Sequence, residues 1–399
     1  MQNPTFRVFK YKNFRLFFPG LIISQIGIWI QNVAINWLVY DLTKSPMITG
    51  ASLFISSVPL LFFTPFSGTI IDKFNKHKLL ILIQVLFSIQ SLIMIVLFLT
   101  KSIAVWNIIL LGFFLNLLIA MDGPLRQSLF INLVKKKEDL TNAISINSSC
   151  FNLVKIVGPS ISGLIIANLG YGICFVVNFL CILPNIILVS LMKIKENEKK
   201  PEKTFWNDFK DGYKYIFSTP KIFYLQLFLA VFCFLIMIYP MLMPIYVKDI
   251  YSANADTLGF LMAMIGLGAL ASSLLIASKK DNKNLKTILT VSAVLLGCCF
   301  IVLSFVKNIY LSAVVAIFMG LSVTGFITPQ ISILQSFIED KFRGRVMSNN
   351  SFCILGIPAV STIISGLIIE KIGILHTFIL YGLVLIFTAI FFADKIREN

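Results

Sequence analysis

The sequence lacks the motifs that mark many enzymes. It contains no G-x-x-x-x-G-K-[ST] loop for nucleotide phosphates, no H-E-x-x-H zinc motif and no G-x-S-x-G turn for a nucleophilic serine. Only 13% of the residues are charged, and the 18 acidic residues are outnumbered by 34 Lys and Arg. These absences argue against a nucleotide hydrolase and against an intramembrane hydrolase.

Histidine and cysteine offer no pattern that would bind a metal. His77 and His376 are the two histidines, and they lie in different parts of the chain. The seven cysteines lie within apolar runs without paired ligand spacing, so we expect small buried hydrophobic side chains. We therefore expect no metal site and no cofactor. The polar N-terminal residues and the long first apolar run also argue against a cleavable signal peptide.

Long apolar runs are what the sequence has in abundance. Apolar residues make up 57% of the chain and gather in twelve stretches. Each stretch has roughly twenty residues, enough for a helix to cross the ~30 Å hydrocarbon core of a membrane. The stretches lie near 16–40, 47–71, 79–100, 103–124, 143–168, 171–192, 222–246, 257–277, 287–306, 309–330, 347–369 and 374–393. The sequence predicts an all-α membrane protein with twelve transmembrane helices.

The basic residues gather in every second gap between these stretches. The gaps on the side of the N-terminus hold 28 of the 34 Lys and Arg, and the opposite gaps hold five. Because basic loops stay in the cytoplasm, we expect a multi-pass membrane protein with both termini cytoplasmic. The net charge of +16 is then assigned to loops that face the anionic lipid bilayer, not to nucleic-acid binding.

The two halves of the chain resemble each other at a shift of 203 residues. Residues 161–166 are identical to residues 364–369, and Gly170 matches Gly373. Compositional bias of membrane helices is the alternative, but scattered polar matches in the same register favour duplication. An even number of helices per half gives both halves the same orientation, as in transporters that rock two six-helix bundles about a central site.

The charged stretch between the halves predicts three parts. We expect an N-terminal six-helix bundle at 1–192, a cytoplasmic linker at 193–221 and a C-terminal six-helix bundle at 222–399. Within the linker, apolar residues recur at helical spacing and predict a short amphipathic helix on the membrane surface, either a structural strut or a regulatory element. Those residues are Phe205, Trp206, Phe209, Tyr213 and Ile216.

Several motifs resemble a known family. The segment 26–41, the loop 68–78, the pair Gly158-Pro159 and the segment 343–348 are similar to those of the major facilitator superfamily, in the branch of enterobactin-type siderophore exporters and macrolide efflux proteins. The resemblance implies two pseudo-symmetric six-helix bundles and gradient-driven efflux of a small amphipathic molecule such as a siderophore or a drug. It further implies protons as a coupling ion, and we expect a monomer.

The loop 68–78 predicts a conformational latch. Gly68, Asp72 and Lys73 carry the family's loop motif, although Asn75 replaces a glycine that the family often has. The Asp72 carboxylate can face the N-terminus of the eleventh helix, with Arg343 and Arg345 just before it as partners. Such contacts would close the cytoplasmic side. The alternative is a solvated surface carboxylate that contributes little.

Lys155 is the most unusual single residue. It lies about twelve residues into the fifth run, hence ~18 Å deep and near the middle of the bilayer. A lysine at that depth needs a partner or water, so we expect it to face a hydrated cavity and to bind substrate or couple transport. A structural ion pair is the alternative. The equivalent position in the second half is Pro358, so the lysine is not part of the shared scaffold.

The fifth run keeps part of a drug-antiporter pattern. Gly158, Pro159 and Gly163 predict a kink and a face of small residues for helix packing. Val154 stands where that pattern has an earlier glycine, which puts antiport by the family's route in question.

Other polar residues within the runs are candidates for lining a substrate pathway. On the first run they share an arc of about 60°, and they either line the cavity or hold helices together. In the seventh run a similar stripe includes a methionine that suits an adaptable pocket. We expect Asp122, with Arg126 one turn away, to be a proton-responsive or loop-contacting carboxylate. The candidates are Gln25, Trp29, Asn32, Asn36, Asp122, Gln226 and Met237.

Three functions remain open on this evidence. The first is export of a small amphipathic molecule by a secondary transporter with alternating access. The second is import of a nutrient, a metabolite or a lysophospholipid by the same mechanism. The third is a membrane receptor or enzyme without translocation, which the missing catalytic motifs disfavour.

Overall fold

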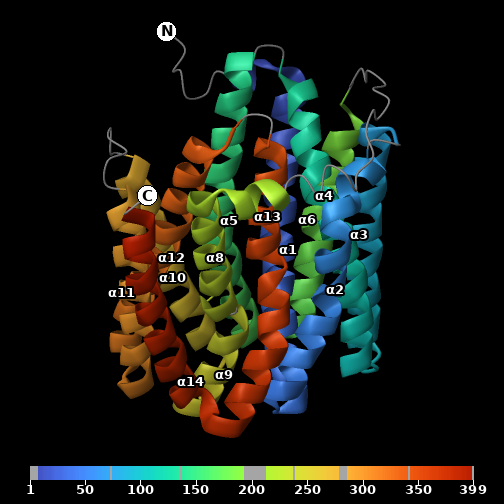
Figure 1. Ribbon diagram of the computed structural model, residues 1–399. Coiled ribbons are helices and arrows are strands. Elements are labelled where there is room, and N and C mark those ends of the chain that lie inside the picture. The colour runs from blue at the N-terminus through green and yellow to red at the C-terminus, as the bar shows by residue number, and fades with distance from the viewer. Residues whose placement is uncertain are drawn as a thin grey trace. The chain divides into compact units, whose positions relative to one another are not determined.

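The computed structural model describes residues 8–71, 74–134, 137–192, 213–236, 239–277, 285–339 and 342–397. Within these ranges every regular element is a helix (Figure 1). In chain order the helices are α1 (Lys12–Thr43), α2 (Pro46–Ile71), α3 (Lys76–Leu99), α4 (Val105–Leu133), α5 (Lys137–Leu169), α6 (Tyr171–Ser190), α8 (Pro220–Ile236), α9 (Tyr239–Tyr251), α10 (Ala255–Ala277), α11 (Leu285–Phe305), α12 (Ile309–Phe337), α13 (Arg343–Leu355) and α14 (Ile357–Arg397).

All twelve predicted runs lie on these helices. In the part of the chain that the structure describes, ten helical stretches are long and apolar enough to cross a membrane. One of them, Arg345–Ala393, covers the last two predicted runs. The fifth run lies in α5, where the described residues include a shorter apolar stretch, Val157–Leu169. The predicted all-α membrane fold is confirmed.

The eleventh predicted helix differs in its boundaries. It begins at Arg343, four residues before the predicted start at 347, so Arg343 and Arg345 lie in its first turn rather than before it. It is interrupted at Gly356, after which α14 begins. The residue Pro358 explains the interruption, because proline clashes with the preceding turn and disfavours helical backbone in the residue before it.

Two repeat-equivalent glycines share one unusual backbone conformation. Gly170 has a φ of 81° and Gly373 a φ of 79°, a region that glycine adopts far more readily than other residues. Gly170 separates α5 from α6, and Gly373 breaks α14 between the last two predicted runs. The same turn at both positions supports the duplication seen in the sequence.

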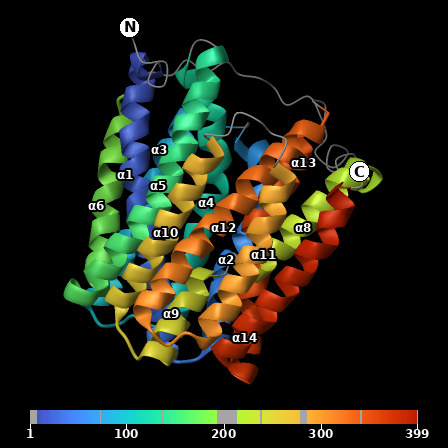
Figure 2. The same ribbon diagram turned by 90° about the vertical axis from the view of Figure 1, so that its left-hand side faces the viewer.

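The chain forms two compact units. The first contains residues 1–39 and 55–202, and the second contains residues 40–54 and 203–399. In the first unit α1 and α6 lie side by side, as Figures 1 and 2 both show. In the second unit α10 crosses α12 so closely that a Cβ atom at Gly268 or Gly320 would strike backbone atoms of the other helix. Small residues permit such contact between membrane helices.

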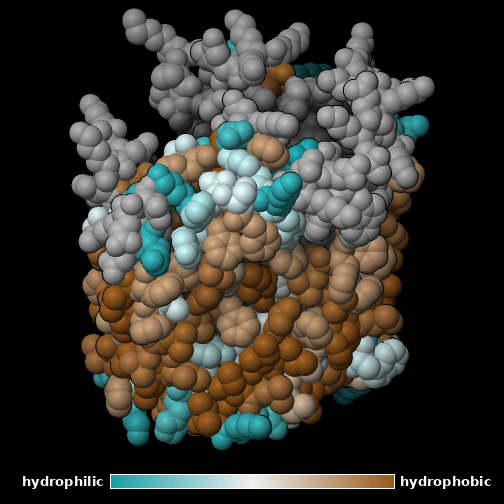
Figure 3. All heavy atoms as spheres, viewed as in Figure 1, coloured by the Kyte–Doolittle hydropathy of each residue, from teal (hydrophilic) through white to brown (hydrophobic). Residues whose placement is uncertain are grey.

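Each unit has its own apolar core. In the first unit Phe14, Phe17 and Phe87 are almost fully buried. In the second unit the rings of Phe232 and Phe326 stack with centroids 3.8 Å apart. The outer flanks are apolar as well: hydrophobic side chains cover the middle of the face shown in Figure 3, and hydrophilic ones gather toward the helix ends. This distribution fits helices that stand in a bilayer.

Of the predicted linker helix, the structure describes only the last part. Residues 213–218 are helical, whereas 193–212 lie outside the described residues. The Tyr215 ring stacks on Phe342 with centroids 4.2 Å apart, and its hydroxyl accepts a hydrogen bond from the backbone N–H of Glu339. This contact ties the start of the second bundle to the turn before α13.

Candidate functional site

The polar stripe on α1 lies on the less buried side of that helix. Gln25, Trp29, Asn32 and Asn36 are all half-buried. Residues between them that face the core, such as Gln31, are completely buried. The stripe is therefore distinct from the packed face of α1. Its assignment to a substrate pathway stays a prediction.

The glycine of the predicted helix-five kink packs directly against this stripe. A Cβ atom at Gly158 would collide with the Cβ of Trp29. One turn further on, the Ser162 hydroxyl donates a hydrogen bond to the Ile30 carbonyl at 2.9 Å. Pro159 is buried in the same helix. Only a glycine at 158 lets α5 approach α1 this closely, so the small-residue face predicted for this segment is used for packing.

The ion pair of Asp122 and Arg126 lies buried inside the first unit. Arg126 Nε donates to Asp122 Oδ2 at 2.6 Å, and the two residues are 3% and 5% exposed. Gln84 of α3 donates to the other carboxylate oxygen at 3.0 Å. Asn185 of α6 then donates to Gln84 at 2.9 Å and to Ser24 of α1 at 3.2 Å. We call these five residues the lower polar layer.

A second cluster repeats the same arrangement two helical turns away. Asn178 of α6 donates to Gln31 of α1 at 2.7 Å, and Ser91 of α3 donates to the same Gln31 oxygen at 3.2 Å. The Gln31 amide nitrogen donates to Gln90 at 3.0 Å. All four side chains are buried. We call them the upper polar layer.

The two layers follow a seven-residue spacing on three helices. The partners are Ser24 and Gln31 on α1, Gln84 and Ser91 on α3, and Asn185 and Asn178 on α6. Seven residues make two helical turns, so each pair lies on one face of its helix. We call these six residues the polar seam. The sequence analysis did not identify it. A search for polar residues at intervals of seven within apolar runs would have detected it.

The lower layer has spare hydrogen-bonding capacity. Both Nη atoms of Arg126 are buried and have no hydrogen-bond partner among the described residues. Asp122 therefore satisfies only one edge of the guanidinium group. The predicted pairing of Asp122 with Arg126 is present, and the predicted role of Asp122 in coupling remains untested.

Other predicted site residues are placed in part. Gln226 is only 4% exposed, and its side chain contacts the Val346 carbonyl and the Cys353 thiol, which favours helix packing over pocket lining. Gly163 is buried in α5. The guanidinium group of Arg345 lies over the Phe342 ring, 5.4 Å from its centroid.

The rest of the predicted site cannot be described from the structure. Asp72, Lys73 and Met237 lie outside the described residues. Lys155 and Arg343 lie on α5 and α13, and Gly68 on α2, but the surroundings of these three positions are not described.

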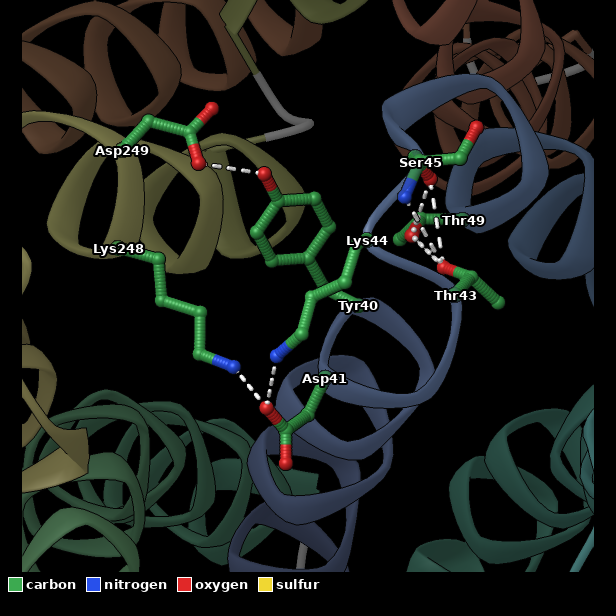
Figure 4. A network of polar contacts seen from close by, with 8 residues as sticks. All are labelled: Tyr40, Asp41, Thr43, Lys44, Ser45, Thr49, Lys248 and Asp249. Carbon is green, nitrogen blue, oxygen red and sulfur yellow. Dashed lines mark hydrogen bonds and ion pairs between the residues drawn. The ribbon is translucent and has the colours of Figure 1, made fainter.

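A third polar cluster lies where α1 ends and α2 begins (Figure 4). Lys248 of α9 and Lys44 both contact the Asp41 carboxylate. Beside them the Tyr40 hydroxyl donates to Asp249 at 2.6 Å. The Asp41 carboxylate raises the pKa of the exposed Lys44 ammonium above its ordinary value. The sequence analysis did not identify this cluster.

The comparison with known families decides what kind of protein carries these clusters. Residues 4–398 match the family of transmembrane secretion effectors of the major facilitator superfamily. The chain belongs to this family. It is therefore a multi-pass membrane transporter for small molecules and not an enzyme.

Curated relatives of this transporter match it over nearly their full length. The staphyloferrin A transporter of Staphylococcus aureus is 24% identical, with 92% of each chain covered. Macrolide efflux protein A of Streptococcus pyogenes is 22% identical, with 96% of each covered. The multidrug efflux pump Tap of Mycolicibacterium fortuitum is 23% identical, with 94% of each covered. The predicted resemblance to siderophore and macrolide transporters is confirmed.

Solved structures share the fold of the transporter. A bacterial homologue of the lysosomal transporter Spinster has a TM-score of 0.76 at 12% identity, with 97% of both chains covered. A bacterial homologue of the iron transporter ferroportin has a TM-score of 0.74 at 14% identity, covering 97% of this chain and 99% of that one. At these identities the likeness concerns the fold alone.

Proposed function

We propose that this transporter exports a small amphipathic molecule, such as a siderophore or a drug, from the bacterial cytoplasm across the inner membrane. The observation that carries the proposal is the match with efflux proteins over nearly the whole length of the chain. Alternating access between two related bundles is the mechanism that the fold and the repeat favour.

The polar stripe of α1 is the proposed lining of the substrate pathway. Polar side chains that are half-buried in a membrane helix are costly against lipid, and water or cargo would satisfy them. Gln25, Trp29, Asn32 and Asn36 supply amides and one aromatic ring, a combination that suits cargo with polar and apolar parts. Lys155 would place a positive charge near the middle of the same pathway.

The ion pair of the lower polar layer is the proposed proton-responsive element. Uptake of a proton by Asp122 would remove the charge that Arg126 pairs with. The guanidinium group, whose Nη atoms already have no described partner, would then seek another acceptor. Such an exchange would change the packing among α1, α3, α4 and α6, and it would link a proton gradient to movement of the first unit.

The proposed cytoplasmic latch gains support from α13. Its first turn contains Arg343 and Arg345 and no acidic residue, so the positive end of the helix dipole and the two cations favour an anion nearby. Asp72 is the proposed anion. With the lysine-rich gaps inside, both termini lie in the cytoplasm. We take the protein to be a monomer that uses protons as the coupling ion.

Transport in a defined orientation tests this proposal. Purified protein is first screened for ligand-dependent thermal stabilisation against siderophores, macrolides and lysophospholipids. A stabilising compound is then offered to inside-out vesicles whose lumen is acidified. Export predicts accumulation in the lumen that stops when the pH gradient is collapsed and is absent from vesicles without the protein. Accumulation only in right-side-out vesicles would show import instead.

A further inference from the structure

The turn between the first two helices is fastened to the second half of the chain. Residues 40–54 contain the end of α1 and the start of α2, yet they belong to the same compact unit as residues 203–399. Because this turn lies in a lysine-poor gap, the proposed orientation places it on the outside of the membrane. The contacts that hold it are therefore candidates for closing that side.

The first of these contacts is ionic. Lys248 of α9 and Lys44 of the turn share the Asp41 carboxylate, which is one-third exposed. Lys248 lies 207 positions further along the chain than Asp41, so this pair joins segments from the two repeats. Partial exposure means that water can replace either partner when the pair separates.

The second contact is a carboxylate that caps a helix from a distance. Glu370 of α14 accepts hydrogen bonds from the Ser45 hydroxyl at 2.9 Å and from the Met47 N–H at 3.0 Å. The remaining N–H groups of this turn are satisfied locally: that of Ile48 by the Ser45 hydroxyl and that of Thr49 by the Ser45 carbonyl. The first residue, Pro46, has no N–H.

Glu370 therefore completes the N-terminus of α2. An anion is favoured at this end of a helix, because the N–H groups and the helix dipole both attract negative charge. Without Glu370, the Met47 N–H would have to hydrogen-bond to water, whereas the other N–H groups of the first turn would keep their partners. The cap is specific in geometry and, being exposed, easily exchanged for water.

The backbones beneath these polar contacts are in close touch. A Cβ atom at Gly50 of α2 would strike the Thr362 carbonyl of α14, and one at Gly366 would lie 2.7 Å from the Pro46 carbonyl. The start of α2 thus packs against α14 backbone to backbone through two glycines. Such a contact is lost as a whole once the helices separate. The closed arrangement is therefore one discrete state and not one end of a continuous movement.

We propose that Asp41, Ser45, Lys248 and Glu370 form an outer clamp, a releasable gate that holds the outside of the transporter shut while cargo is loaded from the cytoplasm. This inference rests on the proposed orientation and direction of transport. Glu370 at the outer end of the eleventh span faces the N-terminus of the second helix. Asp72 at the inner end of the second helix is proposed to face the N-terminus of the eleventh span. One carboxylate-to-helix contact would close each side.

Distance measurement across the clamp tests it without any cargo. Spin labels are placed at Leu42→Cys and Ile372→Cys, two exposed positions, after the seven native cysteines are replaced. Double electron–electron resonance then gives the populations of near and far label pairs. Glu370→Ala is expected to raise the far-to-near ratio about two- to five-fold, the effect of one exposed anion at a helix N-terminus.

The matched control is Asp256→Asn, which removes an exposed carboxylate from the first turn of α10. It should leave the label distances unchanged. Glu370→Gln, which keeps the side-chain length, replaces Glu370→Ala if size-exclusion chromatography shows aggregation. An unaltered ratio in both Glu370 variants overturns the clamp, and so does an equal shift in the Asp256 control. Because no cargo is used, the clamp can fail while export stands, or the reverse.

Discussion

Arg126 donates through its Nε atom to the Asp122 carboxylate at 2.6 Å, one helical turn away on α4. Both side chains are buried in a bundle of apolar helices, and Gln84 supplies the other carboxylate oxygen with a second donor. Removing one member of a buried ion pair leaves the other charge without compensation. Replacing both charged side chains by uncharged polar ones of similar size leaves no charge buried without a partner.

Neutralising either partner alone should therefore destabilise the transporter strongly. Asp122→Asn and Arg126→Gln are each expected to lower the free energy of unfolding by about 3–5 kcal/mol. The double variant Asp122→Asn/Arg126→Gln should regain a large part of that loss. Denaturant unfolding in detergent measures all three. Strictly additive losses would show that the two charges do not depend on each other.

The upper polar layer should contribute to stability through hydrogen bonds. Asn178→Leu removes the donor to Gln31 and Ser91, so the Gln31 oxygen keeps only its bond from Ser91 and the Ser91 oxygen loses its donor in the core. A loss of about 1–3 kcal/mol is expected, the usual cost of buried groups without partners. Asn168→Leu, on the exposed face of α5, is the control and should change stability little. Equal losses of stability in the two variants would show that the hydrogen bonds of the upper polar layer do not stabilise the protein.

The membrane-crossing segments of the fold were predictable because each is marked by its own apolar run. The Asp122 and Arg126 contact was also predictable, since residues four apart share a helix face. The polar seam was not, because Asn178 and Gln31 are 147 positions apart and their meeting depends on how three helices pack. The Glu370 cap was hidden for the same reason, being 323 positions from Met47.

One predicted boundary was displaced by local backbone chemistry, and one polar contact was not visible in the sequence. The eleventh helix was expected to start at 347, but it starts at Arg343 and breaks before Pro358. Gln226 was expected to line a pathway; its side chain contacts α13, and the lining role stays a prediction. A polar side chain in an apolar run looks the same in sequence whether it faces a cavity or a neighbouring helix.

Lys155 should be required for transport but not for folding. Lys155→Ala is expected to abolish cargo flux while expression and size-exclusion profile stay normal, because an intramembrane cation is kept for function rather than packing. Lys101→Ala, in an exposed turn, is the control and should transport normally. If the flux of Lys155→Ala is close to that of the unmodified protein, Lys155 does not have the proposed role in transport.

Asp72→Asn should loosen the proposed cytoplasmic latch. The population of cytoplasm-open forms should rise, because an amide is a weaker partner for the arginine-rich start of α13. Cysteine cross-linking between the loop 72–75 and the loop 338–342 measures this and should become less efficient. Glu339→Gln, which removes a nearby exposed carboxylate, is the control. Cross-linking that is unchanged in Asp72→Asn would count against the latch.

Paired distance measurements on both faces test alternating access most directly. One label pair spans the outer clamp, and a second joins the loops at 72–75 and 338–342. Addition of a cargo that stabilises the protein, or a change of pH, should lengthen distances on one face while shortening them on the other. Faces that stay fixed, or that open and close together, would contradict a transporter that exposes one central site to each side in turn.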